Sequence, residues 1–267
     1  MKRTDPGDFC WIDLLATDLE GQTAFYEQLL GWEHRDLPTD VGPIYRMLTL
    51  DGSIAAGASQ MNPDLQAGGM PSMWSTYIAT DDVDATVARA TALGGQVIMP
   101  AMDVMTEGRM VGIQDPSGGA VFFWQPRSHN GAEVFSTPGS LSWVELNTRD
   151  PQEAIAFFTA LLPTWTVNEM SHPGPRYWQI DANGVGQGGI MPMPDQLPAA
   201  IPPHWLVYFG TRDVRATVQR ARELGASVAM DVTEVPDMLA FAVLMDPAGA
   251  TFAVLQPIGP MSWDANA

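Results

Sequence analysis

The chain has 267 residues, 46% of them hydrophobic, which is enough for one large core or two modest ones. Thirty-one acidic residues against thirteen basic ones give a formal charge of −18, which would repel phosphate backbones and anionic membranes. The single cysteine, Cys10, excludes an intramolecular disulfide framework. No signal-peptide core and no apolar run long enough to span a bilayer is present. We therefore expect a soluble, cytoplasmic protein that binds neither nucleic acid nor membrane.

Internal repetition predicts the domain organisation. The two halves align at an offset of 132 residues, as from Trp11 to Trp143, and the offset slips to 131 after one loop. The matching segments are Asp82–Ala90 with Asp213–Ala221, Asp115–Gly118 with Asp246–Gly249, and Gln125–Pro126 with Gln256–Pro257. A weaker repeat inside each half has an offset of 64, as from Gly31 to Gly95. We predict two tandem domains, residues 1–127 and 140–260, joined by a linker at 128–139, each built from two similar modules.

In chain order, each module begins with a strand that ends near an aspartate, and a helix follows. The predicted helices are Leu19–Leu30, Val83–Leu93, Pro151–Leu162 and Val214–Leu224, each preceded by a suitable N-cap residue. Short strand-like segments follow the helices, among them Tyr45–Leu50, Met110–Gln114, Val121–Gln125 and Ala240–Met245. The unit is therefore βαβββ, four times over, in an α+β fold. Because each module exposes an apolar sheet face, we expect pairs of curved mixed sheets to enclose a cleft.

The first strand of each domain places an indole and a carboxylate on one face, because side chains alternate along a strand. These pairs are Trp11 with Asp13 and Trp143 with Glu145. An ionised carboxylate on an apolar strand is costly unless it is partnered. Each acid is therefore either held by backbone N–H groups or an arginine, or is a general acid or base with a raised pKa. The indoles either pack in the core or stack on a ligand.

Three motifs resemble the vicinal-oxygen-chelate superfamily, which includes glyoxalase I, the bleomycin-resistance proteins and the extradiol dioxygenases. They are the spacing from Asp18 to Phe25-Tyr26 in the first helix, the Asp-Pro-x-Gly turns at Asp115 and Asp246, and the Trp-x-Asp/Glu-Leu openings. The openings are similar to those of a tandem glyoxalase-like subfamily of actinobacteria. The resemblance covers the whole chain and implies two vicinal-oxygen-chelate domains.

The resemblance also implies where metal ligands would stand. The three ligand positions of active metalloenzymes fall on Trp11, Ser75 and Phe122 in the first domain and on Trp143, Leu206 and Ala253 in the second. Divalent metals need several N, O or S donors converging on one point, and these residues do not supply them. A fourth ligand would fall near Ala55 and Gln187. We therefore expect no metal and no other cofactor.

Strand parity predicts what lines the two clefts instead. In the first domain the inward-facing set is Trp11, Asp13, Met73, Ser75, Tyr77, Phe122 and Trp124; in the second it is Trp143, Glu145, Asn147, His204, Leu206, Tyr208, Thr251 and Ala253. Such apolar, aromatic surfaces with few polar groups are typical of small-molecule pockets and suit a flat ligand. The chain has sixteen methionines, which could adapt to an irregular ligand.

The second domain is the expected site of chemistry, with Glu145 and His204 as base and acid, because the counterpart of His204 is Met73. A structural histidine is the alternative. We expect Asn147, Tyr177 and Gln187 to be further polar groups there. In the first domain Arg109 could pair with Asp13 or bind an anionic ligand group, whereas the linker residue His129 should be solvated.

Two functional hypotheses follow. In the first, the protein is a metal-independent isomerase, lyase or cyclase that uses acid–base chemistry on a hydrophobic, aromatic or polyketide-like metabolite. In the second, it sequesters such a compound, as bleomycin-resistance proteins do. A glyoxalase or dioxygenase with a non-standard metal site is a third hypothesis. The expected partner is a small hydrophobic or aromatic ligand, and the protein could be a monomer or a homodimer.

Overall fold

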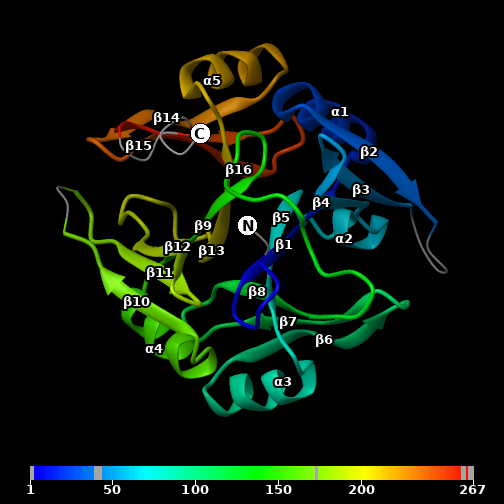
Figure 1. The fold of residues 1–267 in the computed structure, drawn as a ribbon, viewed down its shortest axis with the longest axis vertical. Coiled ribbons are helices and arrows are strands. Elements are labelled where there is room, and N and C mark those ends of the chain that lie inside the picture. Colours follow the sequence, from blue (N-terminus) through cyan, green and yellow to red (C-terminus); the bar gives the residue numbers. More distant parts are fainter. Residues whose placement is uncertain (1–2, 39–43, 172–173, 260–262, 264–267) are drawn as a thin grey trace.

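The computed structural model describes residues 3–38, 44–171, 174–259 and 263. Two eight-stranded mixed sheets and peripheral helices make up the fold (Figure 1). The first half contains β1 (Phe9–Ala16), α1 (Leu19–Leu30), β2 (Trp32–Leu37), β3 (Tyr45–Leu50), β4 (Ser53–Gln60), α2 (Pro63–Ala67), β5 (Met73–Ala79), α3 (Val83–Ala92), β6 (Gln96–Val104), β7 (Gly108–Gln114) and β8 (Ala120–Pro126). The second half contains β9 (Leu141–Thr148), α4 (Pro151–Leu161), β10 (Trp165–Glu169), β11 (Trp178–Ala182), β12 (Val185–Pro192), β13 (His204–Gly210), α5 (Val214–Glu223), β14 (Ser227–Val235), β15 (Leu239–Met245) and β16 (Thr251–Pro257).

The predicted four βαβββ modules are confirmed. The strand order is β2-β3-β4-β1-β5-β8-β7-β6 in the first sheet and β10-β11-β12-β9-β13-β16-β15-β14 in the second. The two modules of a domain meet where their first strands pair antiparallel, β1 with β5 and β9 with β13. Each domain therefore has one continuous sheet in which both modules meet at the centre. The predicted Trp-x-acid strands, β1 and β9, lie at this junction, where the inward-facing residues of both modules come together.

Aspartate caps fix where the four main helices begin. The side chains of Asp18, Asp82, Asp150 and Asp213 each accept a hydrogen bond from a backbone N–H in the first helical turn. A negative group at this position also interacts favourably with the helix dipole. The short helix α2 was not predicted from the sequence; Asn62 caps it, and it lacks a buried side chain.

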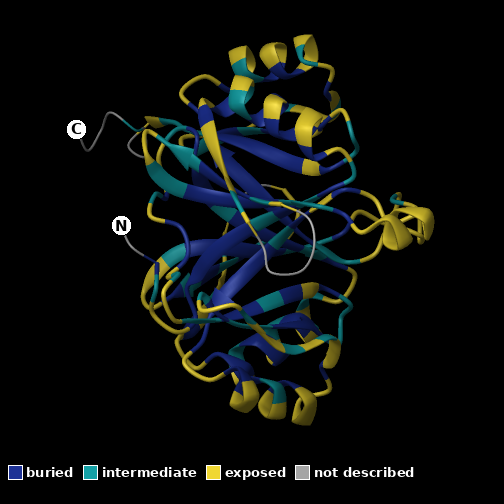
Figure 2. Cartoon of the chain, turned by 90° about the vertical axis from the view of Figure 1, so that its right-hand side faces the viewer, coloured by how far each residue is buried: buried dark blue, intermediate teal, exposed yellow. Residues whose placement is uncertain are grey.

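The four longer helices lie at two opposite ends of the molecule, α1 beside α5 and α3 beside α4, with the strands between them (Figure 1). The first module of one domain thus meets the second module of the other, which is an approximate two-fold arrangement. Aromatic residues from both domains pack at this interface: Phe9 with Trp205, and Trp32 with Phe209. Buried residues run continuously through the middle of the molecule between the exposed helices (Figure 2).

Polar contacts also tie the domains together. The Asp246 carboxylate of the second domain accepts hydrogen bonds from Gln22 Nε2 at 2.7 Å and from Tyr26 Oη at 3.1 Å. The linker packs on the first domain, where Ala132 N donates to Cys10 O and Glu133 N donates to Ile54 O. These contacts hold the domains in one arrangement. No helix in the described part of the chain is long and apolar enough to cross a bilayer.

Candidate functional site

Each sheet has an inner face, which we define as the face bearing Trp11 and Asp13 in the first sheet and Trp143 and Glu145 in the second. Strand register identifies the neighbours, because directly paired residues project on the same side of a sheet. In the first sheet, one row runs through Trp11, Tyr77 and Phe122, and the next runs through Gly57, Asp13 and Ser75. In the second sheet the rows are Trp143, Tyr208 and Ala253, then Gly189, Glu145 and Leu206.

A tyrosine links the indole to the acid on both inner faces. In the first domain Trp11 Nε1 donates to Tyr45 Oη at 3.3 Å, and Tyr45 Oη donates to Asp13 Oδ2 at 3.3 Å. In the second domain Trp143 Nε1 donates to Tyr177 Oη at 2.7 Å, and the Tyr177 hydroxyl bonds to the Glu145 carboxylate. The sequence repeat therefore corresponds to a repeated indole–phenol–carboxylate chain. Among the residues that the structure describes, no arginine and no backbone N–H group holds either acid.

The two acids differ in how completely they are hydrogen-bonded. Asp13 Oδ1 has no exposed surface and no hydrogen-bond partner among the described residues. Desolvation by burial raises the pKa of Asp13 to about 7, and the hydrogen bond from Tyr45 opposes that rise. A buried carboxyl group with one unpaired oxygen and a pKa near neutrality can both take up and release a proton.

Glu145 is buried and has more partners. Its Oε1 accepts hydrogen bonds from Tyr208 Oη at 2.9 Å and from Asn147 Nδ2 at 3.2 Å, in addition to the bond with Tyr177. Burial raises its pKa, and the three hydrogen bonds lower it. Glutamate reaches Tyr208 because its side chain is one methylene longer than that of aspartate. This acid is therefore largely satisfied by the protein itself.

His204 is the first residue of β13 and lies beside Asn147 on the second inner face. Its Nδ1 is 2.9 Å from the carbonyl oxygen of Pro202. The hydrogen bonds to Glu145 come from two tyrosines and Asn147, and His204 is not among these partners. Among the described residues, no hydrogen bond therefore joins Glu145 to His204, the expected base and acid. His204 is paired with Asn147, two residues further along β9 than Glu145.

Two expected site residues lie elsewhere, which corrects the sequence-based placement. Arg109 pairs with Asp84 of α3 at 2.9 Å and with Asp103 at 3.4 Å, on the helix side of the sheet. Its neighbours Gly108 and Met110 are opposite Pro126 and Trp124, so alternation turns Arg109 away from the inner face and from Asp13.

Gln187 is directed to the domain interface, where its Oε1 accepts from Phe9 N at 3.0 Å and its Nε2 donates to Asp8 at 2.6 Å. The register shifts between Ile180 and Asp181, whose partners are Gly188 and Gly186, so Gln187 is the extra residue of a bulge. A bulge breaks the alternation on which the expectation rested.

The remaining predicted residues lie as strand parity implies. Leu206 and Tyr208 are buried with Ala253 and Leu255 in a separate apolar cluster, against which Trp143 packs. Trp124 lies over Gly108, where a side chain would overlap the indole ring. The first inner face also exposes large apolar side chains: Met73 is 41% exposed, and Met102, which pairs with Met110 beside Trp124, is 47% exposed.

His129 is a third residue that sequence reasoning placed wrongly. The linker residue His129, expected in solvent, lies with its ring centroid 4.6 Å from that of Trp11 and 5.9 Å from that of Trp124. No periodic pattern exists in the linker that could have indicated this contact.

The metal-ligand positions do converge on the inner faces, but their side chains do not fit a divalent ion. Trp11, Ser75 and Phe122 offer one hydroxyl, and the Trp11 Nε1 hydrogen is already donated to Tyr45. Trp143, Leu206 and Ala253 offer no metal donor. Within the described ranges, no group of three or more His, Cys, Asp or Glu residues is placed to hold a metal ion.

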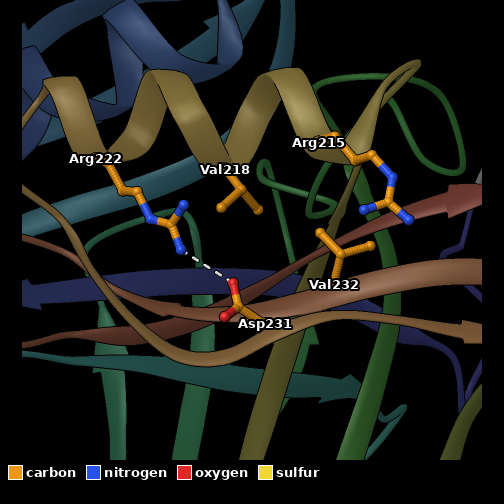
Figure 3. A pocket seen from close by; sticks show the side chains of 5 residues that line it. All are labelled: Arg215, Val218, Arg222, Asp231 and Val232. Atoms are coloured by element: carbon orange, nitrogen blue, oxygen red, sulfur yellow. Dashed lines mark hydrogen bonds and ion pairs between the residues drawn. The ribbon is translucent and has the colours of Figure 1, made fainter.

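A surface hollow of about 220 Å³ lies between α5 and β14, away from both inner faces (Figure 3). Val218 and Val232 face each other across it, and Arg222 reaches Asp231 at 3.0 Å. Arg215 is paired with Glu234 at 2.9 Å. Because both guanidinium groups at this hollow are paired, we do not consider it the candidate site.

The fold and the repeated inner faces define a tandem protein of vicinal-oxygen-chelate architecture. Residues 9–123 match the Glyoxalase/Bleomycin resistance protein/Dioxygenase superfamily, and residues 143–255 match the Glyoxalase-like domain family. The chain belongs to the glyoxalase/bleomycin resistance/dioxygenase superfamily, with two such domains in tandem.

Two similar proteins cover nearly the whole chain. "Putative glyoxylase CFP32" of Mycobacterium tuberculosis (strain CDC 1551 / Oshkosh) is 41% identical over 92% of this chain and 94% of its own length. "Anthracycline biosynthesis protein DnrV" of Streptomyces peucetius is 34% identical over 96% of this chain and 95% of its own length.

Solved structures share the fold at much lower identity. The Mn(II)-bound glyoxalase from Novosphingobium aromaticivorans has a TM-score of 0.62 and 14% identity, over 97% of this chain and 85% of that one. The 2,3-dioxygenase LapB from Pseudomonas sp. KL28 has a TM-score of 0.63 and 15% identity, over 96% of both chains.

Proposed function

We propose that the protein is a metal-independent acid–base enzyme that acts on a hydrophobic, polycyclic aromatic metabolite bound at the first inner face. The single observation that carries this proposal is Asp13, whose Oδ1 is buried without a partner and whose pKa is raised to about 7. A general base works best when its pKa is near the working pH.

The chemistry would be proton transfer at a carbon next to a carbonyl group. Asp13 Oδ1 takes the proton as the C–H bond breaks, and the electron pair moves onto the carbonyl oxygen to give an enolate. Tyr45 keeps its hydrogen bond to Oδ2, which holds the carboxyl group in place throughout. Return of the proton to another atom of the ligand completes an isomerisation. Expulsion of a substituent from the carbon next to the enolate carbon would instead complete an elimination, and attack of the enolate carbon on a second carbonyl carbon of the same ligand would close a ring.

The surroundings of Asp13 and the similar proteins both support a polycyclic aromatic ligand. Trp11, Tyr77 and Phe122 form an aromatic row beside it, and the exposed Met73 and Met102 add adaptable apolar surface. A relative named for anthracycline biosynthesis matches nearly the full chain, and anthracyclines are polycyclic aromatic polyketides.

The absence of a metal is part of the same proposal. The side chains at the ligand positions of the two domains supply one hydroxyl between them, which is insufficient for a stable divalent site. Proton transfer by a carboxyl group with a suitable pKa needs no metal.

A second candidate places the chemistry at Glu145 on the second inner face, because burial also raises the pKa of this acid. Its three hydrogen bonds already occupy the carboxylate, whereas Asp13 keeps an oxygen without a partner among the described residues. The other class of function, sequestration without turnover, requires only the aromatic surface and no proton transfer.

The test is solvent exchange. The wild-type protein is incubated in D₂O with polycyclic aromatic ketones that carry an acidic C–H, and deuterium uptake is followed by mass spectrometry. An acid–base enzyme accelerates uptake above the buffer rate. Tight binding of these ketones without accelerated uptake would instead establish sequestration.

A further inference from the structure

His129 is a linker residue that both backbone and ring contacts fix over the first inner face. Its N–H donates to Glu107 O at 3.1 Å, and its carbonyl oxygen accepts from Trp124 Nε1 at 2.9 Å. Its ring meets the Trp11 ring nearly edge-on, at an interplanar angle of 85°. The linker therefore contributes a side chain to the same surface as Trp11 and Asp13.

The Nε2 atom of His129 has no exposed surface and no hydrogen-bond partner among the residues that the structure describes. Burial lowers the pKa of the imidazole, against the opposing effect of Glu107 and Glu133. A neutral imidazole can donate or accept at Nε2, depending on its tautomer. Leaving such an atom buried and unpaired is unfavourable, so it calls for an explanation.

Two unpaired polar atoms therefore flank Trp11. Asp13 lies two residues from Trp11 on the same face, which is roughly 7 Å along a strand, and His129 packs on the indole itself. The intervening surface is aromatic, with Tyr77 stacked on Phe122 at 5.0 Å. A flat ring system with oxygen atoms on its edge would satisfy both atoms while covering apolar surface.

We propose that His129 is a ligand-binding residue of the first inner face, where its Nε2 hydrogen-bonds a carbonyl or hydroxyl oxygen of a flat polycyclic ligand that Asp13 engages at another position. This inference rests on the proposed function and deepens it, since it specifies an oxygenated rather than a plain aromatic ligand. Among the described residues of the second domain, no histidine takes the same position, and Leu255 is the counterpart of Trp124 at the offset of 131.

The alternative is that His129 has a purely structural role, in which its imidazole N–H makes a weak contact with the ring face of Trp11. The two explanations differ in what the substitution His129→Phe does. Phenylalanine keeps an aromatic ring against Trp11 and removes both nitrogens. If His129 serves a ligand, this variant loses affinity but not stability; if the contact is structural, it loses stability but not affinity.

The experiment uses 1,8-dihydroxyanthraquinone as the probe, with binding followed by quenching of tryptophan fluorescence. We expect His129→Phe to weaken binding about tenfold, which corresponds to one buried hydrogen bond. His129→Gln, which retains hydrogen-bonding capacity, should recover part of the loss. The control His204→Phe, on the second inner face, should bind as wild type does.

Unchanged affinity in His129→Phe, with or without a lower melting temperature, would overturn the inference. If Asp13→Asn still abolished deuterium exchange in that case, the proposed function would stand without it. Loss of probe binding in Glu145→Gln and His204→Phe, but not in Asp13→Asn or His129→Phe, would overturn both.

Discussion

The hydroxyl of Tyr45 occupies the space that a side chain on Gly57 would fill. Gly57 is paired with Asp13 in the sheet, so the missing side chain is what lets the phenol reach the carboxylate. The same relationship recurs in the second domain, where the hydroxyl of Tyr177 lies over Gly189 beside Glu145. Both glycines are thus explained by a close approach within the site.

Alanine at either glycine should displace the tyrosine hydroxyl from its acid. We expect Gly57→Ala and Gly189→Ala each to lower the free energy of unfolding by about 1–3 kcal/mol, as overpacked sites do. Urea denaturation measures this. Only Gly57→Ala should also slow deuterium exchange, because it disturbs Asp13. Equal slowing by Gly189→Ala would contradict the placement of the chemistry in the first domain.

The raised pKa of Asp13 makes stability depend on pH. The Asp13 carboxyl group has a pKa of about 7 in the folded protein, against an ordinary aspartate pKa of 3.8, so it binds its proton more tightly when the protein is folded. Ionisation of Asp13 therefore lowers the free energy of unfolding progressively as the pH rises from about 4 to about 7. Asp13→Asn cannot titrate, so its melting temperature relative to wild type should rise across this window.

The control for that experiment is Asp195→Asn, which removes the same charge at an exposed loop position. Its difference from wild type should stay nearly constant between pH 4 and pH 8. A constant difference for Asp13→Asn as well would show that Asp13 titrates alike in the folded and unfolded chain.

The donor set at the inner faces leads to a prediction about metal. Protein purified without chelator should contain no stoichiometric divalent ion, and dialysis against EDTA should leave the exchange rate unchanged. Elemental analysis and the exchange assay check the two statements. One tightly held manganese, iron, nickel or zinc ion per chain, whose removal abolishes exchange, would refute the metal-independent mechanism.

The domain interface should be sensitive to Tyr26, which donates to Asp246 Oδ2 at 3.1 Å and accepts from Trp74 Nε1 at 2.9 Å. Tyr26→Phe leaves a buried indole N–H unpaired and the carboxylate with one bond fewer. We expect a loss of about 1–3 kcal/mol in urea denaturation. Ala24→Gln, on the exposed side of the same helix, should change stability by less than about 0.5 kcal/mol.

The fold could be predicted because the same βαβββ module recurs four times in the sequence. Repeated segments such as Asp115–Gly118 and Asp246–Gly249 fixed the modules, and alternation along β1 and β9 assigned Trp11, Asp13, Trp143 and Glu145 to common faces. These inferences hold wherever a strand is regular, since a regular strand turns every second side chain to the same side.

The site could be predicted only in part, because its remaining contacts depend on irregular structure. Gln187 lies at a bulge and therefore points away from the expected face. His129 contacts Trp11 from a linker that has no periodic pattern. The choice between the acids depended on their partners: two tyrosines and Asn147 satisfy Glu145, whereas Asp13 keeps a free oxygen. These differences in hydrogen-bond partners arise because glutamate is one methylene longer than aspartate. They leave no pattern in the sequence.

The most direct measurement compares Asp13→Asn with Glu145→Gln in the deuterium-exchange assay, with ligand affinity measured in parallel. Both changes keep the side-chain size and remove the titratable proton acceptor. We expect Asp13→Asn to slow exchange by about 10²–10⁴-fold with affinity nearly unchanged, and Glu145→Gln to exchange at close to the wild-type rate. Full exchange activity in Asp13→Asn, together with its loss in Glu145→Gln, would contradict the assignment and place the chemistry on the second inner face.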